Sequence, residues 1–307
     1  MTDTTISSSS IPQNRPLPGI LVRLLAIASL ACMFVCVKLA AERGTHIIEL
    51  LFYRQLFALV VLLPFFLAGP GLATLKTDYP KLHISRMIVG LTGMGFNFWA
   101  VSLLPLAEAT TIGFMVPIFA TLLSVVLLAE WVGIHRWAAI ILGFIGVLIV
   151  VQPGDGHIPL FGAAVAITGA LFTAWVSVLI RQLGRTEKPA TTVFWFTVSS
   201  LPLLATAMLY FGQMHDAGTW ALIAGAGLFG SIGQLTLTTS LRLAPVSTIL
   251  SMDYTSLIWA TLFGYLIWNN WPGPSTWIGA PIIIGCGLYI AWREHKISIS
   301  EPINVPE

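Results

Sequence analysis

Charged residues are scarce in this chain of 307 residues. Lysine, arginine, aspartate and glutamate make up 9% of it, and 56% of its residues are hydrophobic, whereas a soluble domain carries about 25% charged residues. The mean hydropathy is +0.87. This composition excludes a soluble enzyme or regulatory domain, and it predicts an all-α integral membrane protein.

Cysteine and the common catalytic motifs are also rare. The three cysteines, Cys32, Cys36 and Cys286, lie inside apolar stretches, so we expect them to be packing residues rather than disulfide partners or metal ligands. The chain has no phosphate-binding loop and no HExxH pattern, which argues against ATP use and against a metal or other cofactor. A net charge of +2 is too small to suggest a nucleic-acid partner.

The N-terminal segment gives no sign of a secretory leader. Residues 1–16 are polar and serine-rich, and we expect them to form a disordered tail. The first apolar run, from Leu17 to about Ala41, is longer than the hydrophobic core of a signal peptide. We therefore interpret this run as a membrane span.

A helix needs about 20 apolar residues to cross a bilayer, and this length divides the chain into ten predicted spans. They lie near 17–41, 47–69, 82–104, 107–129, 134–152, 158–181, 190–211, 219–242, 245–268 and 275–292. The connectors are short and contain turn residues. No room remains for a soluble domain.

The two halves of the chain resemble each other at an offset of 140 residues. Matches in this register include Gly90 with Gly230, Pro105 with Pro245 and Trp137 with Trp277. We therefore divide the chain into a tail (1–16), a first repeat (17–152), a second repeat (157–292) and a C-terminal tail (293–307). Because each repeat holds five spans, the second repeat is expected to enter the membrane upside down, which is the geometry of alternating-access transporters.

Lysine and arginine predict the orientation. With a cytoplasmic N-terminus, most of these residues fall on the cytoplasmic side, while the opposite side keeps only Lys38 and Arg43. The positive-inside rule then places both termini in the cytoplasm. We expect a multi-pass protein of the cell inner (cytoplasmic) membrane.

Residues 105–154 carry a recognisable pattern. Small residues open the fourth span, Pro117 lies in its middle and Glu130 closes it, and the next span is punctuated by Gly143 and Gly146. This pattern resembles the EamA repeat of the drug/metabolite transporter superfamily, and two such repeats cover residues 17–292. The second repeat departs from the pattern, because Asn270 and Leu257 stand where Glu130 and Pro117 would recur.

The resemblance implies a ten-helix bundle whose substrate path is lined mainly by the first four helices of each repeat. The family moves small metabolites that include amino acids, S-adenosylmethionine, riboflavin and drugs. Residues 88–153 look most similar to the S-adenosylmethionine uptake and amino acid export branches. This likeness implies a zwitterionic or cationic substrate, and a riboflavin-type or drug-type transporter is the alternative within the family.

Asp253 and Arg54 are the two predicted intramembrane charges. Asp253 lies about eight residues, or roughly 12 Å, into the ninth span, and Arg54 lies at a similar depth in the second span from the opposite face. Such residues are functional candidates by default. We hypothesise that Arg54 receives a substrate carboxylate and Asp253 a substrate ammonium. The alternatives are a direct Arg54–Asp253 ion pair, an arginine that meets only backbone carbonyls, or an Asp253 bonded to nearby hydroxyls.

The other candidates are mid-span polar and aromatic residues. Asn97 and Gln234 must find hydrogen-bond partners in protein, water or substrate. Trp99, Trp175 and Tyr254 are expected to stack on a ring or hold a cation, although packing explains most tryptophans in such chains.

Two glutamates are assigned gating or structural roles. Glu108 opens the fourth span, where a carboxylate complements a helix N-terminus, and capping and substrate contact explain it equally well. Glu130 closes the same span beside His135 and Arg136. We interpret Glu130 as part of a structural or gating salt bridge.

These features favour a secondary transporter over an enzyme. A membrane enzyme would need a polar cluster at a membrane face, and the longest connectors lack paired His, Asp or Ser groups. The partners we expect are a small-molecule substrate and membrane lipid, with proton coupling left open, in a monomer or weak dimer. A non-transporting scaffold or assembly subunit is the alternative from another class.

Overall fold

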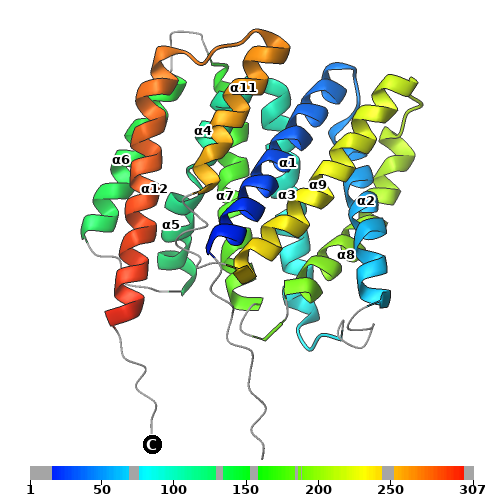
Figure 1. Ribbon diagram of the computed structural model, residues 1–307, viewed down its shortest axis with the longest axis horizontal. Coiled ribbons are helices and arrows are strands. Elements are labelled where there is room, and N and C mark those ends of the chain that lie inside the picture. Colours follow the sequence, from blue (N-terminus) through cyan, green and yellow to red (C-terminus); the bar gives the residue numbers. More distant parts are fainter. Residues whose placement is uncertain are drawn as a thin grey trace, which may run out of the picture.

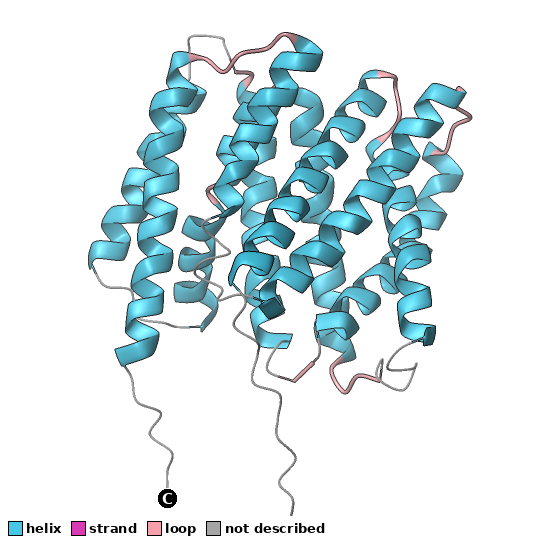
Figure 2. Cartoon of the chain, viewed as in Figure 1, coloured by secondary structure: helices cyan, strands magenta, loops and turns pink. Residues whose placement is uncertain are grey.

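The computed structural model describes residues 16–68, 76–128, 134–152, 158–183, 186–187, 189–243 and 252–300. Within these ranges the chain forms helices and connecting turns and no strand (Figure 2). The all-α class predicted from composition is confirmed.

The helices follow the predicted division of the chain. The first half contains α1 (Pro16–Glu42), α2 (Ile47–Ala68), α3 (Pro80–Leu103), α4 (Leu106–Gly113), α5 (Val116–Leu128) and α6 (Ile134–Val151). The second half contains α7 (Leu160–Leu183), α8 (Pro189–Phe211), α9 (Ala217–Leu243), the 3-10 helix η2 (Asp253–Thr255), α11 (Ser256–Trp268) and α12 (Pro274–Ser300).

Six helical segments of the described chain are long and apolar enough to cross a membrane. They are Leu17–Glu42, Leu106–Val126, Leu160–Ile180, Thr191–Phe211, Ala217–Ser240 and Pro274–Trp292. Many large apolar side chains on these segments face outward, such as Leu25, Leu209 and Ile278. An apolar outer surface of this kind suits a bundle surrounded by lipid.

The two halves pack in the pattern that a two-fold relation between repeats requires. The offset of 140 residues pairs α1 with α7, α3 with α9 and α6 with α12. The most extensive helix contacts are α1 with α9 and α3 with α7, which are the same contact in its two copies. Counterpart helices also face each other, α6 against α12 and α2 against α8, at the two sides of the bundle in Figure 1. The start of α1 and the end of α12 lie at the same end of the bundle (Figure 1).

The fourth predicted span of each half is interrupted at matched positions. In the first half, Phe114 and Met115 donate to carbonyls three residues back, at 3.1 and 3.0 Å. Pro117 follows this turn, and its ring crowds the carbonyl of Gly113 while its missing N–H leaves that carbonyl without an α-helical bond. In the second half η2 begins at Asp253, 140 residues after Gly113. Leu257 stands at the position of Pro117, so the second interruption forms without a proline.

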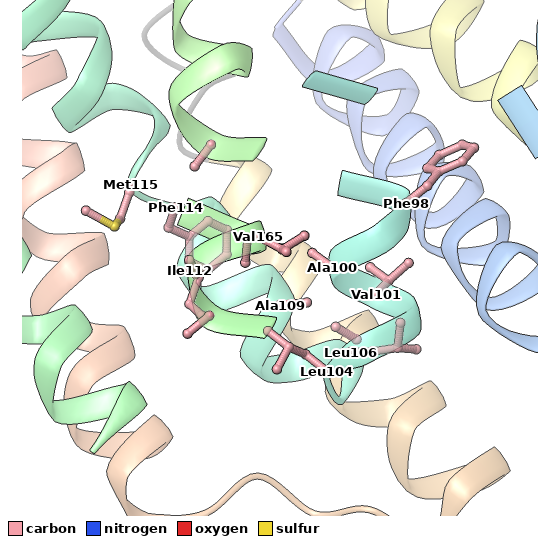
Figure 3. Close-up of a cluster of buried hydrophobic side chains, with 14 of the residues drawn as sticks. Phe98, Ala100, Val101, Leu104, Leu106, Ala109, Ile112, Phe114, Met115 and Val165 are labelled. Carbon is pink, nitrogen blue, oxygen red and sulfur yellow. The ribbon is translucent and has the colours of Figure 1, made fainter. Parts of the chain in front are cut away.

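A buried apolar cluster fixes the turn between α3 and α4. Phe98, Leu104 and Ile112 are almost fully buried in it, and Figure 3 shows Val165 of α7 between Ala100 of α3 and Phe114 at the end of α4. This packing anchors the start of α4 and therefore sets the direction of the interrupted helix.

Glycines allow α6 and α12 to approach closely. A Cβ atom added at Gly279 would lie 2.6 Å from the carbonyl oxygen of Gly146, and one added at Gly146 would lie 3.3 Å from the carbonyl oxygen of Gly279. Backbone atoms cannot move aside as a flexible side chain can. The contact therefore depends on the absence of side chains at both positions.

We expect Gly279→Ala to destabilise the protein by about 1–3 kcal/mol, as overpacking does in close-packed interiors. Thermal unfolding of the detergent-purified protein measures the change. Gly285→Ala on the same helix is the control, because a Cβ there meets no atom within 4 Å. Equal effects of the two substitutions would refute the close α6–α12 contact.

Candidate substrate-binding site

A central cavity of about 990 Å³ lies between the two halves. Its walls come from α1, α3, α4, α5, α7, α9, η2, α11 and α12. The lining is mostly apolar, and its polar side chains include Arg23, Asn97, Gln234, Asp253 and Tyr254. The family resemblance implied the first four helices of each repeat. The observed walls instead draw on the first, third and fourth helices of each repeat, together with α12.

Asp253 forms a bidentate ion pair with Arg23. Arg23 Nε donates to Asp253 Oδ1 at 2.7 Å, and Nη2 donates to Oδ2 at 2.6 Å. Arg23 is 4% exposed, whereas the Asp253 side chain is 39% exposed and faces the cavity. Arg23 Nη1 also lies 3.5 Å from Ser240 Oγ on α9. The pair therefore ties α1 to the interrupted helix of the second half.

The Arg54–Asp253 ion pair, which the sequence left open as an alternative, does not form in this structure, because the partner of Asp253 is Arg23. Arg23 is one of the arginines that the positive-inside rule places at the cytoplasmic flank of a span, and its ion pair with Asp253 was not predicted. Its position could have indicated an intramembrane charge, since Arg23 stands inside the apolar run GILVRLLAIA. Nothing in the sequence says which of several intramembrane arginines faces a given carboxylate across the bundle.

Arg54 lines a second cavity of about 400 Å³ that is bounded by α1, α2, α3, α7, α8 and α9. Its Nη1 donates to Gln55 Oε1 at 2.7 Å. Arg86 on α3 lines the same cavity and was counted only as a flanking charge in the sequence. Arg54 and Asp253 thus line different cavities, and the substrate-bracketing hypothesis remains a prediction.

Asn97 and Gln234 lie where the two cavities meet. Both residues line both cavities, as do Thr173 and Arg86. Asn97 Nδ2 donates to Gly93 O at 2.8 Å and to Thr173 Oγ1 at 2.9 Å. These bonds join α3 to α7 and fix the amide beside the junction. A solute could therefore contact side chains of both cavities at once.

The three aromatic candidates have different surroundings. Tyr254 lines the central cavity and makes an edge contact with Phe114, with ring centroids 5.0 Å apart. Phe114 is the residue that the repeat pairs with Tyr254. Trp99 is 36% exposed and packs on Phe161, and Trp175 stacks on Phe172. Neither tryptophan is among the residues that line the two cavities.

Glu108 is buried at the start of α4. Its Oε1 accepts a hydrogen bond from Thr276 Oγ1 of α12 at 3.4 Å, so the carboxylate joins the two halves. Glu130, the other predicted gating carboxylate, lies outside the described residues.

Further polar contacts lie at the same end as Glu108, and the first two of them join the halves. Trp268 Nε1 donates to Glu42 at 2.8 Å, and His215 Nε2 lies 3.1 Å from Glu49 Oε1. Lys38 Nζ donates to the carbonyls of Val101 and Leu104 at 2.9 Å each, which ties α1 to the end of α3. The Arg23–Asp253 pair lies toward the opposite end. Each end of the bundle is thus joined by bonds that can break without unfolding a helix.

Known proteins resemble this chain over nearly its whole length. A model of the EamA-like transporter family matches residues 17–152 and 160–292. A riboflavin transporter of Rhizobium johnstonii is 29% identical, with 96% of this chain and 98% of that protein aligned. An S-adenosylmethionine uptake transporter of Rickettsia bellii is 28% identical, with 89% and 93% aligned. A solved crystal structure superposes with a TM-score of 0.62 at 18% identity, covering 91% of this chain and 98% of that chain, and this likeness shows the fold alone.

A double-mutant cycle tests the Arg23–Asp253 pair. We expect Arg23→Gln and Asp253→Asn each to lower thermal stability, and the double variant to lose less than the sum, with a coupling of about 0.5–3 kcal/mol, because contacting residues are not additive.

The control for this cycle is the exposed pair of Arg43 and Asp216, whose Nη1 and Oδ2 atoms are 3.7 Å apart. Its coupling should be smaller, within the range of about 0–1 kcal/mol measured for solvated pairs. Additive effects of the Arg23 and Asp253 substitutions would show that the two side chains do not interact.

Proposed function

Because the chain belongs to the EamA-like transporter family, we propose that it is a secondary transporter that carries a small organic metabolite across the membrane by alternating access. The observation that supports this proposal best is the cavity of about 990 Å³ between the two halves. Ligand pockets of about 300–1,000 Å³ accommodate whole metabolites. A cavity enclosed between repeats is also the usual site in transporters built in this way.

The proposed topology has ten spans in two inverted repeats, with both termini in the cytoplasm and the protein in the cytoplasmic membrane. Its support is the position of the first and last helices, which begin and end at one end of the bundle (Figure 1), together with the excess of lysine and arginine predicted on that side. This topology makes the end that carries Glu42, Glu49 and Glu108 the outer one.

In the proposed cycle the two ends open in turn. The bonds of Glu42, Glu49 and Glu108 join the two halves at the outer end, and they must break for the cavity to open outward. The interruptions after Gly113 and at Asp253 lie in repeat-related positions. Helices lacking a continuous hydrogen-bond ladder bend more readily there, so both interruptions are suited to act as hinges.

The proposed substrates include those that the relatives' names supply, riboflavin and S-adenosylmethionine, together with amino acids. A cationic group would have to compete with Arg23 for the carboxylate of Asp253, because both oxygens already accept bonds from Arg23. The solute gradient or a proton gradient would drive the flux. A scaffold subunit remains the alternative, and loss of flux in a folded variant would exclude it.

Ligand-induced stabilisation is the first test of the proposal. The detergent-purified protein is heated with riboflavin, S-adenosylmethionine, and small and aromatic amino acids in turn. A ligand at about 100 times its dissociation constant adds roughly 2.7 kcal/mol to the native state, so a substrate should raise the melting temperature clearly. Uptake of that ligand into proteoliposomes should follow. A ligand that binds without any flux would favour the scaffold alternative.

Filling the cavity should block transport without unfolding the protein. Gly113 lines the central cavity, and a Cβ there meets no atom within 4 Å. We expect Gly113→Leu to reduce flux about tenfold or more while changing stability by about 0.5 kcal/mol or less, since the new side chain meets no buried neighbour. Gly285→Leu is the matched control, because Gly285 has equal space and lies outside the cavity lining. Unchanged flux in a folded Gly113→Leu protein would refute the proposed path.

A further inference from the structure

The second cavity contains two guanidinium groups. Arg54 of α2 and Arg86 of α3 both line this space of about 400 Å³, and its described lining includes no carboxylate. Arg54 and Arg86 are 8% and 7% exposed. Two buried like charges repel each other, and a buried charge without a counter-charge is strongly destabilising. This arrangement therefore needs a compensating partner.

Arg86 has free hydrogen-bond donors. Its Nε and Nη1 atoms are buried and have no hydrogen-bond partner. Its Cζ lies 3.8 Å from the centroid of the Phe196 ring, which supports one face of the guanidinium. The ring contact leaves the in-plane N–H groups available. Such N–H groups bind carboxylate and phosphate oxygens strongly, often in pairs.

Arg54 is oriented by hydrogen bonds that run through two uncharged side chains. Its Nη1 donates to Gln55 Oε1, and Gln55 Nε2 donates to Ser200 Oγ at 2.7 Å. These bonds orient the guanidinium and leave its charge uncompensated. The neighbouring hydroxyls of Thr197, Ser231 and Thr238 already donate to carbonyls of their own helices. The arginines are therefore the suitable donors for an anion.

Repeat-related glycines make room for both arginines. A Cβ added at Gly90 would lie 2.9 Å from Arg86 Nη1, and one added at Gly230 would lie 3.4 Å from Arg54 Nε. Gly90 and Gly230 are the same position in the two halves. Each helix thus has a glycine at the equivalent position beside a guanidinium, Gly90 of α3 beside Arg86 and Gly230 of α9 beside Arg54.

We propose that Arg54 and Arg86 form an oxyanion-binding subsite that receives the carboxylate or phosphate group of the transported solute. The rest of the solute lies in the central cavity, which the second cavity joins beside Asn97, Thr173 and Gln234. The role of the subsite in transport rests on the function proposed above, whereas its affinity for an oxyanion does not.

Titration with inorganic phosphate and with citrate tests the subsite. The melting temperature of the full-length, detergent-purified protein is followed at constant ionic strength set with sodium chloride. The wild type should show a saturable increase. Arg86→Gln and Arg54→Gln should each raise the half-saturating concentration about tenfold or more, as the loss of a charged hydrogen bond does. Arg86→Lys should fall between them and the wild type, because it keeps the charge and loses the planar fork.

Two controls separate anion binding from a structural role. Arg43→Gln should retain the anion-induced increase, because Arg43 is exposed and lines neither cavity. In buffer without phosphate or citrate, Arg86→Gln should melt no lower than the wild type, since it removes an uncompensated buried charge. A purely structural Arg86 would instead make the variant less stable at every anion concentration. That result, or half-saturating concentrations in Arg54→Gln and Arg86→Gln equal to that of the wild type, would overturn the proposal.

An anionic lipid headgroup carries the same chemistry, and a second arm distinguishes it. The phosphate titration is repeated in nanodiscs of phosphatidylcholine with and without phosphatidylglycerol. A phosphate response that phosphatidylglycerol leaves unchanged supports a soluble anion, whereas competition that disappears in Arg86→Gln would overturn the assignment to a solute. The titration requires no transport. Arginine-dependent phosphate binding in a protein that moves none of the tested metabolites would keep the subsite and refute the function.

Discussion

Charge buried inside an apolar helical bundle is the constraint on which this structure depends. Hydrocarbon solvates an ion poorly, so each intramembrane charge must meet a counter-charge, a dipole, water or a ligand. The protein meets this requirement in two ways. Arg23 and Asp253 neutralise each other in the wall of the central cavity, and Lys38 binds the free carbonyls that end α3. Arg54 and Arg86 share a cavity whose described lining offers no opposite charge, and that difference identifies them as the groups open to an anion.

The repeat explains how these groups are brought together. The most extensive contacts between the halves come in pairs, so α1 packs on α9 as α7 packs on α3. The axis that relates the halves passes near Phe114 and Tyr254, which are paired by the repeat and touch each other. The two interrupted helices meet there as well. The polar groups depart from this symmetry. Asp253 corresponds to Gly113 in the other repeat, so only the second half has a carboxylate at this position.

Much of the fold could be predicted from the sequence, because the signals are local or periodic. Apolar runs gave the helices, turn residues separated them, and glycines, prolines and tryptophans in register revealed the repeat. The EamA resemblance rested on residues 105–154 and is confirmed by the match of the family model to both halves. The interruption before Pro117 could also be predicted, because a proline inside a span breaks the α-helical hydrogen bonds. The one at Asp253 could not, because Leu257 gives no local signal there.

The sequence by itself determined an all-helical membrane protein, its two related halves and its family, since hydrophobic length, turn chemistry and repeat register are properties of the chain read in order. Only the tertiary structure decided which charges meet. Arg23 and Asp253 are separated by 230 positions, and Arg54 and Arg86 come from different helices that share one cavity. Such pairings depend on the rotation and depth of each helix in the bundle, and a shift of one residue turns a side chain by about 100° around its helix. The packing of many apolar residues from several helices sets that rotation, so the rotation cannot be predicted from any single segment of the sequence.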